Sequence, residues 1–241
     1  MYKYGEEHPV IFEIILIIAS FAVAAVFNIA GYLFNLHPDL SNSAARIITG
    51  IVLLVIYKRA YKGNHFFDNL VIVLPALLFP AWNIIYYLSS GIAFGGANFF
   101  IEGAITAIAP ALFEEVIFRM IFIYNLKKKG SSDLQCLFIS SALFAAMHLT
   151  NLAGMNPASV AVQTVYSFVI GMVLAAVYLR NESLLQVIAV HFLIDLTTRI
   201  FMEHPAYASP LQLIIFGLVL AAEAAYAVWL TVKGPGSSEA K

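Results

Sequence analysis

The sequence predicts an all-α, polytopic membrane protein, in which a bundle of about eight transmembrane helices surrounds a polar intramembrane cavity. Of its 241 residues, 61% are hydrophobic and only 11% are charged, and the mean hydropathy is +0.87. A soluble domain is about 45–50% apolar and about 25% charged. The apolar surplus continues along the whole chain, so we expect many membrane spans rather than a soluble domain with one anchor.

A spanning helix needs about 20 mainly apolar residues. The stretches that approach this length are, in chain order, 10–34, 44–61, 69–90, 98–126, 133–150, 159–180, 183–203 and 209–232. Turn-forming residues separate them, namely His37-Pro38-Asp39, Lys62-Gly63-Asn64, Gly95-Gly96, Gly130-Ser131-Ser132, Asn156-Pro157, Arg180-Asn181-Glu182-Ser183 and Glu203-His204-Pro205. We therefore expect one transmembrane domain over residues 1–233, followed by a disordered tail over 234–241.

The basic residues are distributed unevenly between the two sides of the predicted bundle. With eight spans, both termini share one side with Lys3, Lys58, Arg59, Lys62, Lys127, Lys128, Lys129, Arg180, Lys233 and Lys241. The opposite side holds only Arg46 and Arg199, and Arg119 lies within a helix. Because basic residues concentrate in cytoplasmic loops, we expect a multi-pass protein of the cell membrane with both termini in the cytoplasm.

Composition also excludes several kinds of site and partner. The net charge is −1 and no basic run suits nucleic-acid binding, so we expect no nucleic-acid partner. The single cysteine, Cys136, excludes an internal disulfide and a cysteine-based zinc centre. Any chemistry must therefore come from the ionisable residues inside the apolar stretches.

Two adjacent glutamates, Glu114 and Glu115, lie near the middle of the 98–126 stretch. An ionised group at bilayer depth costs about 2.5–3.5 kcal/mol on insertion scales, so such residues rarely persist there without a function. Neighbouring helical positions point about 100° apart, so the two carboxylates face different surroundings. The i, i+4 spacing of Glu115 and Arg119 favours an ion pair, which leaves Glu114 to face a polar cavity. The alternative is a buried ion-pair network that only holds helices together.

Two further helices carry histidines. His148 ends its stretch with Phe144 one turn before it on the same face, and His191 precedes Asp195 by one turn. A carboxylate beside a histidine fixes its tautomer and orientation in catalytic and metal sites. Read singly, a histidine near a helix end such as His148 is more often a hydrogen-bonded interfacial residue than a ligand. The pair of His191 and Asp195 is equally explained as a polar link between helices. Carboxylates and imidazoles together are the groups that activate water, so the three clusters predict an intramembrane hydrolase.

The three clusters are predicted at different depths in the bilayer. Counted at about 1.5 Å per residue from the cytoplasmic ends, His191 lies about 12 Å deep, Glu114 about 18 Å and His148 about 24 Å. They meet in one cavity only if the helices tilt, bend or begin deeper than hydropathy suggests.

Three motifs occur in order on separate helices: Glu114-Glu115-x-x-x-Arg119, Phe144-x-x-x-His148 and His191-x-x-x-Asp195. This pattern resembles the CPBP (Abi) family of intramembrane proteases, which includes the type II CAAX prenyl endopeptidases. The run from Gln163 to Asp195 is also similar to the family's approach to its last motif. The resemblance covers about residues 98–200, which would form the family core of the domain.

The resemblance implies an eight-helix fold with a conical cavity open to the cytoplasm and the membrane. The catalytic residues that it implies are Glu114, His148, His191 and Asp195, supported by Glu115, Arg119 and Phe144. In this scheme Glu114 activates a water molecule with help from His148, and the pair on the later helix stabilises the oxyanion. The implied partners are membrane lipid and a peptide or membrane-protein substrate, and prenylation of the substrate's C-terminus is left open.

Asp195 departs from the family pattern, because CAAX endopeptidases commonly have Asn at this position. An Asn donates a hydrogen bond to an oxyanion, whereas an ionised Asp cannot. Asp195 is therefore a protonated acid, an orienting group for His191 or a metal ligand. Glu114, His148 and His191 match zinc in ligand type but lack the tight spacing of a zinc motif. A glutamate-dependent mechanism is favoured, and a divalent metal such as zinc stays open as a cofactor.

An intramembrane endopeptidase is the leading interpretation, and two other classes of protein compete with it. A membrane transporter or proton relay also uses buried Glu and His, but the chain has no evident internal repeat or paired broken helices. A non-catalytic immunity or scaffold protein would use the same polar clusters only to fix helix packing. The three classes differ in whether Glu114 and His148 are needed for function.

Overall fold

The computed structural model describes residues 2–63, 66–203 and 208–233. Within these ranges the regular structure is helical, apart from an isolated antiparallel bridge between Phe94 and Phe201. The predicted all-α class is therefore confirmed. The predicted tail at 234–241, and parts of the predicted breaks at 62–64 and 203–205, lie outside the described residues.

The α-helices of the described residues are α1 Tyr2–Glu7, α2 Pro9–Leu33, α3 Pro38–Ile56, α4 Leu78–Ser89, α5 Gly96–Glu115, α6 Ile123–Lys128, α7 Asp133–Met147, α8 Pro157–Asn181, α9 Leu184–Arg199 and α10 Pro210–Lys233. Two 3-10 turns, Leu70–Ile72 and Leu74–Leu77, lead into α4, and a third, His148–Ala153, follows α7. A π-helix, Val116–Phe122, joins α5 to α6. Each predicted apolar stretch therefore contains helix, and α1 precedes the first of them.

The helical segments that are long and apolar enough to cross a membrane are Pro9–Leu33, Pro38–Ile56, Asp133–Ala153, Pro157–Asn181 and Pro210–Lys233. The protein is therefore an integral, multi-pass membrane protein. The other predicted spans fall short for local reasons. The α4 stretch begins with 3-10 turns that include Pro75, α9 has only 16 residues, and α5 carries three glutamates. The total of eight spans stays a prediction.

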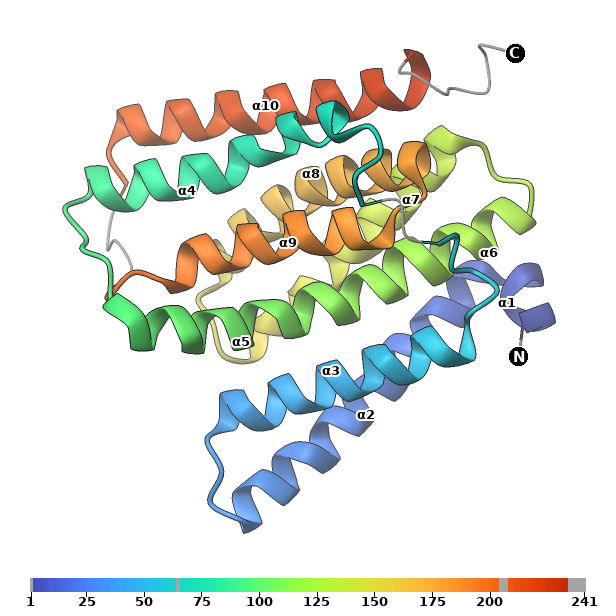
Figure 1. Cartoon of the computed structure of the whole chain (residues 1–241), viewed down its shortest axis with the longest axis horizontal. Helices are drawn as coiled ribbons and strands as arrows, with labels where there is room; N and C mark the ends of the chain where they lie inside the picture. Colours follow the sequence, from blue (N-terminus) through green and yellow to red (C-terminus); the bar gives the residue numbers. More distant parts are fainter. Residues whose placement is uncertain (1, 64–65, 204–207, 234–241) are drawn as a thin grey trace.

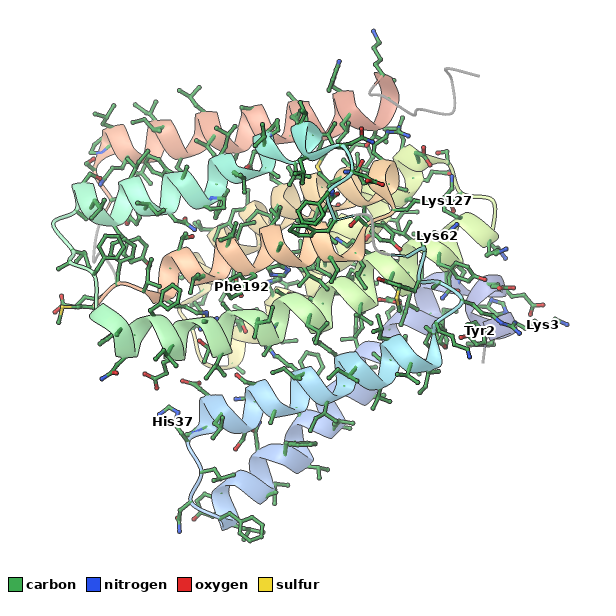
Figure 2. The ribbon with its side chains drawn as sticks, in the orientation of Figure 1. Tyr2, Lys3, His37, Lys62, Lys127 and Phe192 are labelled. Carbon is green, nitrogen blue, oxygen red and sulfur yellow. The ribbon has the colours of Figure 1, made fainter. Side chains whose placement is uncertain are left out.

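Successive long helices run in alternating directions along the long axis, so the start of α1 and the end of α10 lie at the same end of the bundle (Figure 1). The α2–α3 hairpin forms one flank, where α3 packs against α5. Behind it α5 packs against α9, α9 against α4, and α8 against both α7 and α10. Figure 2 shows Lys3, Lys62 and Lys127 at the end where α1 begins, called here the basic end, and His37 at the opposite, non-basic end.

The most deeply buried part of the core is the π-helix. All seven of its residues are buried, and the Arg119 side chain among them has no exposed surface. A π-helical turn interrupts the regular hydrogen-bond ladder of an α-helix and occurs frequently at functional sites. Here it follows Glu115 directly, so the irregular part of the helix lies beside the predicted catalytic residues.

Candidate active site

A cavity of about 450 Å³ lies between the α2–α3 hairpin and α5, α7, α8 and α9. Its polar and charged lining consists of Ser20, Asn28, Asn42, Arg46, Thr49, Glu114, His148, Thr150, Asn151, Gln163, His191, Asp195 and Arg199. Side chains of α2, among them Ile17 and Phe21, supply an apolar wall. All four predicted catalytic residues therefore line the same cavity, although the sequence places them at different depths.

The cavity lies in the half of the bundle that faces the non-basic end. The residues that α7, its following turn and α8 contribute are Met147, His148, Thr150, Asn151 and Gln163, all close to the connection at that end. The side chains of Arg46 and Arg199 are 43% and 42% exposed, whereas that of Glu114 is only 7% exposed. The two arginines therefore mark the mouth of the cavity, and Glu114 lies in its interior.

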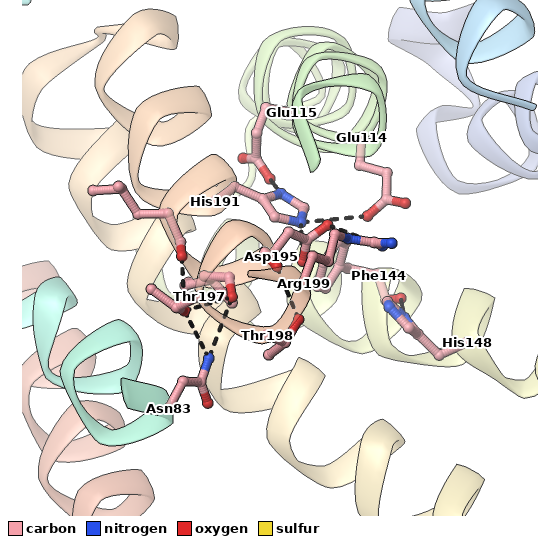
Figure 3. A network of polar contacts seen from close by, with 12 residues as sticks. Asn83, Glu114, Glu115, Phe144, His148, His191, Asp195, Thr197, Thr198 and Arg199 are labelled. Carbon is pink, nitrogen blue, oxygen red and sulfur yellow. Dashed lines mark hydrogen bonds and ion pairs between the residues drawn. The ribbon is translucent and has the colours of Figure 1, made fainter. Parts of the chain in front are cut away.

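Glu114 lies between an arginine and a histidine. Its Oε1 is 3.7 Å from Nη1 of Arg46 on α3. Its Oε2 is 3.8 Å from Nε2 of His191 on α9 (Figure 3). Both separations are longer than a hydrogen bond, so the charge of Arg46 holds the carboxylate in place while its lone pairs remain able to accept a proton. This is the environment that a general base needs.

Glu115 makes closer contacts and is fully buried. Its Oε1 accepts a hydrogen bond from Nδ1 of His191 at 2.7 Å, and its Oε2 lies 3.1 Å from Nε of Arg119. The Glu115–Arg119 pair has the i, i+4 geometry that the sequence predicts. The sequence suggests Asp195 as the orienting group for His191, but its Oδ1 is 4.0 Å from Nε2. Glu115 instead accepts a hydrogen bond from Nδ1, the other nitrogen of the ring, because α5 places the Glu115 carboxylate on that side of the His191 imidazole.

His148 lies across the cavity from this cluster. Its Nδ1 is 3.0 Å from the carbonyl oxygen of Phe144, and among the described contacts none joins it directly to Glu114 or His191. The Phe144 ring lies between the two histidines, with its centroid 5.1 Å from the His148 ring and 5.9 Å from the His191 ring. The same ring is 4.5 Å from the Arg119 guanidinium, so Phe144 packs against three groups of the site.

The hydrogen bonds define which nitrogen of each neutral imidazole carries the proton. A backbone carbonyl only accepts, so Nδ1 of His148 must donate to Phe144. Glu115, paired with Arg119, likewise accepts from Nδ1 of His191. In their neutral forms both rings therefore present Nε2 as an acceptor.

Arg46 and Arg199 are the site residues that the motifs miss. Arg46 faces Glu114, and Nη2 of Arg199 is 4.0 Å from Oδ2 of Asp195. Arg199 had a usable signal, because it follows Asp195 with the same i, i+4 spacing as Glu115 and Arg119. Arg46 had a weaker one: an arginine inside an apolar stretch is as costly as a glutamate, but no spacing connects it with a partner on another helix.

The fit of the site to a metal can be tested from its ligands. Across residues 2–63, 66–203 and 208–233, no three His, Cys, Asp or Glu side chains are arranged to hold a metal ion. Glu114, His148 and His191 line one cavity without forming such a ligand set. The residues as placed do not fit a zinc centre, so no catalytic step is derived through a metal, and metal dependence stays a prediction to test.

Fold and site together define a multi-pass membrane protein with a buried carboxylate–histidine–arginine cluster. Residues 96–197 match the family described as Type II CAAX prenyl endopeptidase Rce1-like. The match begins at the first residue of α5, ends in α9 and includes all three motifs. This segment is therefore similar to the CAAX-type intramembrane proteases, which confirms the resemblance to the CPBP family. Neither a curated protein nor a solved structure matches the chain.

Proposed function

We propose that this protein is an intramembrane endopeptidase that uses Glu114 to activate water and cleaves near the C-terminus of a membrane-associated, prenylated peptide or protein. The observation that carries the proposal is the position of Glu114 inside a polar cavity, between Arg46 and Nε2 of His191. The family match supports the protease class. The proposed site consists of Glu114, His148, His191 and Asp195.

The reaction begins with a water molecule that donates one hydrogen bond to Glu114 and one to Nε2 of His191. Glu114 takes a proton, the water oxygen bonds to the carbonyl carbon, and the π electron pair moves to the carbonyl oxygen. When this tetrahedral intermediate collapses, the C–N bond breaks and Glu114 returns the proton to the leaving nitrogen. The products are a carboxylic acid and an amine.

Other residues of the cluster keep these two acceptors in position. Glu115 fixes the tautomer and orientation of His191, and Arg119 balances the charge of Glu115. Nε2 of His148 supplies another acceptor across the cavity, where it assists in holding the water. Each group has one task, which agrees with the different directions of the two adjacent glutamates.

The walls of the cavity suit a substrate that arrives from the membrane. Ile17, Phe21, Ala24 and Ala25 of α2 form an apolar wall, on a helix of which most side chains face outward. An isoprenoid chain is apolar and would bury surface against such a wall at about 25 cal/mol per Å². This arrangement supports a lipidated substrate and membrane lipid as a neighbour.

We further propose one domain over residues 1–233 with eight spans in the cell membrane and with both termini in the cytoplasm. The basic end then faces the cytoplasm, and the cavity opens toward the opposite face. The resemblance implies a cavity open to the cytoplasm, so the two expectations conflict. We give priority to the charge bias, because it is a property of this chain's own loops.

The proposal is tested with purified protein in proteoliposomes and an internally quenched peptide whose fourth residue from the C-terminus is an S-farnesylated cysteine. We expect cleavage by the wild type, and a loss of about 100- to 10,000-fold for Glu114→Gln. Glu223→Gln is the matched control: Glu223 is equally buried on α10, but it accepts from the backbone N–H of Phe79 at 3.1 Å and lies outside the cavity.

Three outcomes would contradict the proposal. Full activity of Glu114→Gln would remove its proposed base. Substrate-dependent proton flux without cleavage would favour a transporter. Biological function that survives Glu114→Gln and His148→Asn together would favour a non-catalytic membrane partner.

A further inference from the structure

The proposed reaction places a negative charge on the carbonyl oxygen, and a donor for that oxygen is needed. The neutral rings of His148 and His191 both present Nε2 as an acceptor, because their Nδ1 atoms donate elsewhere. Asp195 stands where CAAX endopeptidases commonly have Asn, and an ionised Asp has no proton to donate. The residues of the three motifs therefore leave the oxyanion without an assigned donor in the neutral-ring state.

We propose that Arg46 is a further catalytic residue, which donates hydrogen bonds to the oxyanion of the tetrahedral intermediate. Its Nη1 lies 3.7 Å from Oε1 of Glu114, the group that removes the proton from the water. A carbonyl carbon attacked by that water lies within a few ångströms of Glu114, so its oxygen comes within reach of the guanidinium. This assignment rests on the proposed protease function.

The Arg46 guanidinium has donors available for this role. Among the described residues, it has one ion pair, with Glu114, at a separation too long for a hydrogen bond, and its charge also acts on Asp195. A guanidinium carries five N–H donors in a planar fork that matches an oxygen anion. The side chain is 43% exposed and lines the cavity, so a substrate can approach it without displacing a tight partner.

A glycine one turn further along α3 brings Arg46 close to Glu114. A Cβ atom at Gly50 would lie 3.3 Å from both Cγ of Leu112 and the backbone Cα of Phe113. The missing side chain therefore lets α3 approach the backbone of α5 immediately before Glu114. Because positions four apart share one face of a helix, this close contact also directs Arg46 toward the catalytic carboxylate.

Arg199 is the natural comparison for Arg46. Both line the same cavity and are exposed to almost the same degree. Arg199, however, lies on α9 beside Asp195, with 4.0 Å between Nη2 and Oδ2, and has no ion pair with Glu114 among the described contacts. It balances the charge of Asp195, whereas Arg46 borders the reacting atoms. The two arginines should therefore differ in how strongly they recognise a transition state.

The test uses a phosphonate analogue of the farnesylated reporter peptide, in which a tetrahedral anion replaces the scissile amide. We expect Arg46→Gln to lower kcat/KM and phosphonate affinity by a common factor of about 100 to 1,000, with little change in KM. Arg46→Lys keeps the charge but not the planar fork of N–H donors, so its phosphonate affinity should lie between those of the wild type and Arg46→Gln. Arg199→Gln should show a clearly smaller loss of phosphonate affinity.

The pairing of Arg46 with Glu114 requires a second measurement, because losing the arginine also alters the base. Phosphonate affinity is therefore compared between Glu114→Gln and the Glu114→Gln/Arg46→Gln double variant. Binding of the phosphonate does not depend on proton abstraction, so the missing base does not affect the comparison. A further loss in the double variant supports oxyanion contact. Equal affinity overturns the inference, as does an equal effect of Arg199→Gln.

The two hypotheses fail in different ways. Absence of cleavage by the wild type contradicts the protease function itself. Cleavage by the wild type and undiminished cleavage by Arg46→Gln contradict only the role of Arg46. If Arg46→Gln does not fold, Arg46→Lys is compared with the wild type in its place. The inference is overturned if Arg46→Lys binds the phosphonate as tightly as the wild type does.

Discussion

Replacing Arg119 with methionine removes a buried guanidinium and leaves a chain of similar length. In the native protein neither Arg119 nor Glu115 has exposed surface, and Nε and Oε2 are 3.1 Å apart. The variant would leave the Glu115 carboxylate with His191 Nδ1 as its partner and without a full counter-charge. Breaking one side of a buried ion pair costs about 3–5 kcal/mol in the free energy of unfolding.

That loss of stability is large enough to measure by thermal unfolding. For a chain of 150–250 residues, 1 kcal/mol corresponds to about 2–4 °C, so Arg119→Met should lower Tm by about 6–20 °C. The single cysteine provides the assay: Cys136 is fully buried, and a thiol-reactive fluorophore in detergent reports its exposure on heating.

The double variant Glu115→Gln/Arg119→Met separates charge from packing. It removes the stranded carboxylate, while the methionine keeps an apolar contact with Phe144. We expect it to regain more than half of the Tm lost by Arg119→Met, because replacing both members of a buried pair is often nearly neutral. A Tm for Arg119→Met within about 2 °C of wild type, or a double variant no more stable than the single, would refute this reasoning.

Three other predictions concern helix approach, metal and topology. Gly50→Val should push α3 away from α5 and lower kcat/KM by about 10- to 100-fold. Gly217→Val on α10 should leave kcat/KM unchanged, because a Cβ atom there meets nothing within 4 Å. Equal effects of the two variants would contradict the role of the close contact. Activity should survive prolonged treatment with 1,10-phenanthroline, because the proposed base acts without a metal, and loss of activity that added Zn²⁺ restores would reverse that conclusion. In intact cells, a membrane-impermeant maleimide should label Thr150→Cys at the cavity and should not label Lys128→Cys near the basic end. The native Cys136 is buried and should not react. The opposite labelling pattern would place the cavity on the cytoplasmic face.

Much of the fold was predictable because each break in hydropathy contains turn chemistry. His37-Pro38-Asp39 and Asn156-Pro157 lie at helix starts, with Pro38 and Pro157 as the first helical residues. The prediction of one continuous helix over residues 69–90 was less accurate. It includes Pro75, which lacks an N–H, and its first part forms 3-10 turns before α4 begins. Hydropathy measures apolar character and does not distinguish these two forms of helix.

The site was predictable where its contacts are local. The spacing of Glu115 and Arg119 predicts their ion pair, because residues four apart are neighbours on a helix. The hydrogen bond from His191 to Glu115 joins residues 76 apart in sequence, so no spacing rule predicts it. The same is true of Arg46 and Glu114, which meet only because α3 packs against α5. Counting depth along straight helices placed Glu114, His148 and His191 at different levels of the bilayer, whereas helix packing brings all three to one cavity.

The central claim is that Glu114 activates the water that cleaves the substrate. The most direct measurement is mass spectrometry of the products formed in H₂¹⁸O by the wild type and by Glu114→Gln. We predict that the wild type incorporates one ¹⁸O atom into the new carboxyl group during a single turnover, and that Glu114→Gln forms essentially no product. Product formation by Glu114→Gln at the wild-type rate, with the same incorporation, would contradict the account.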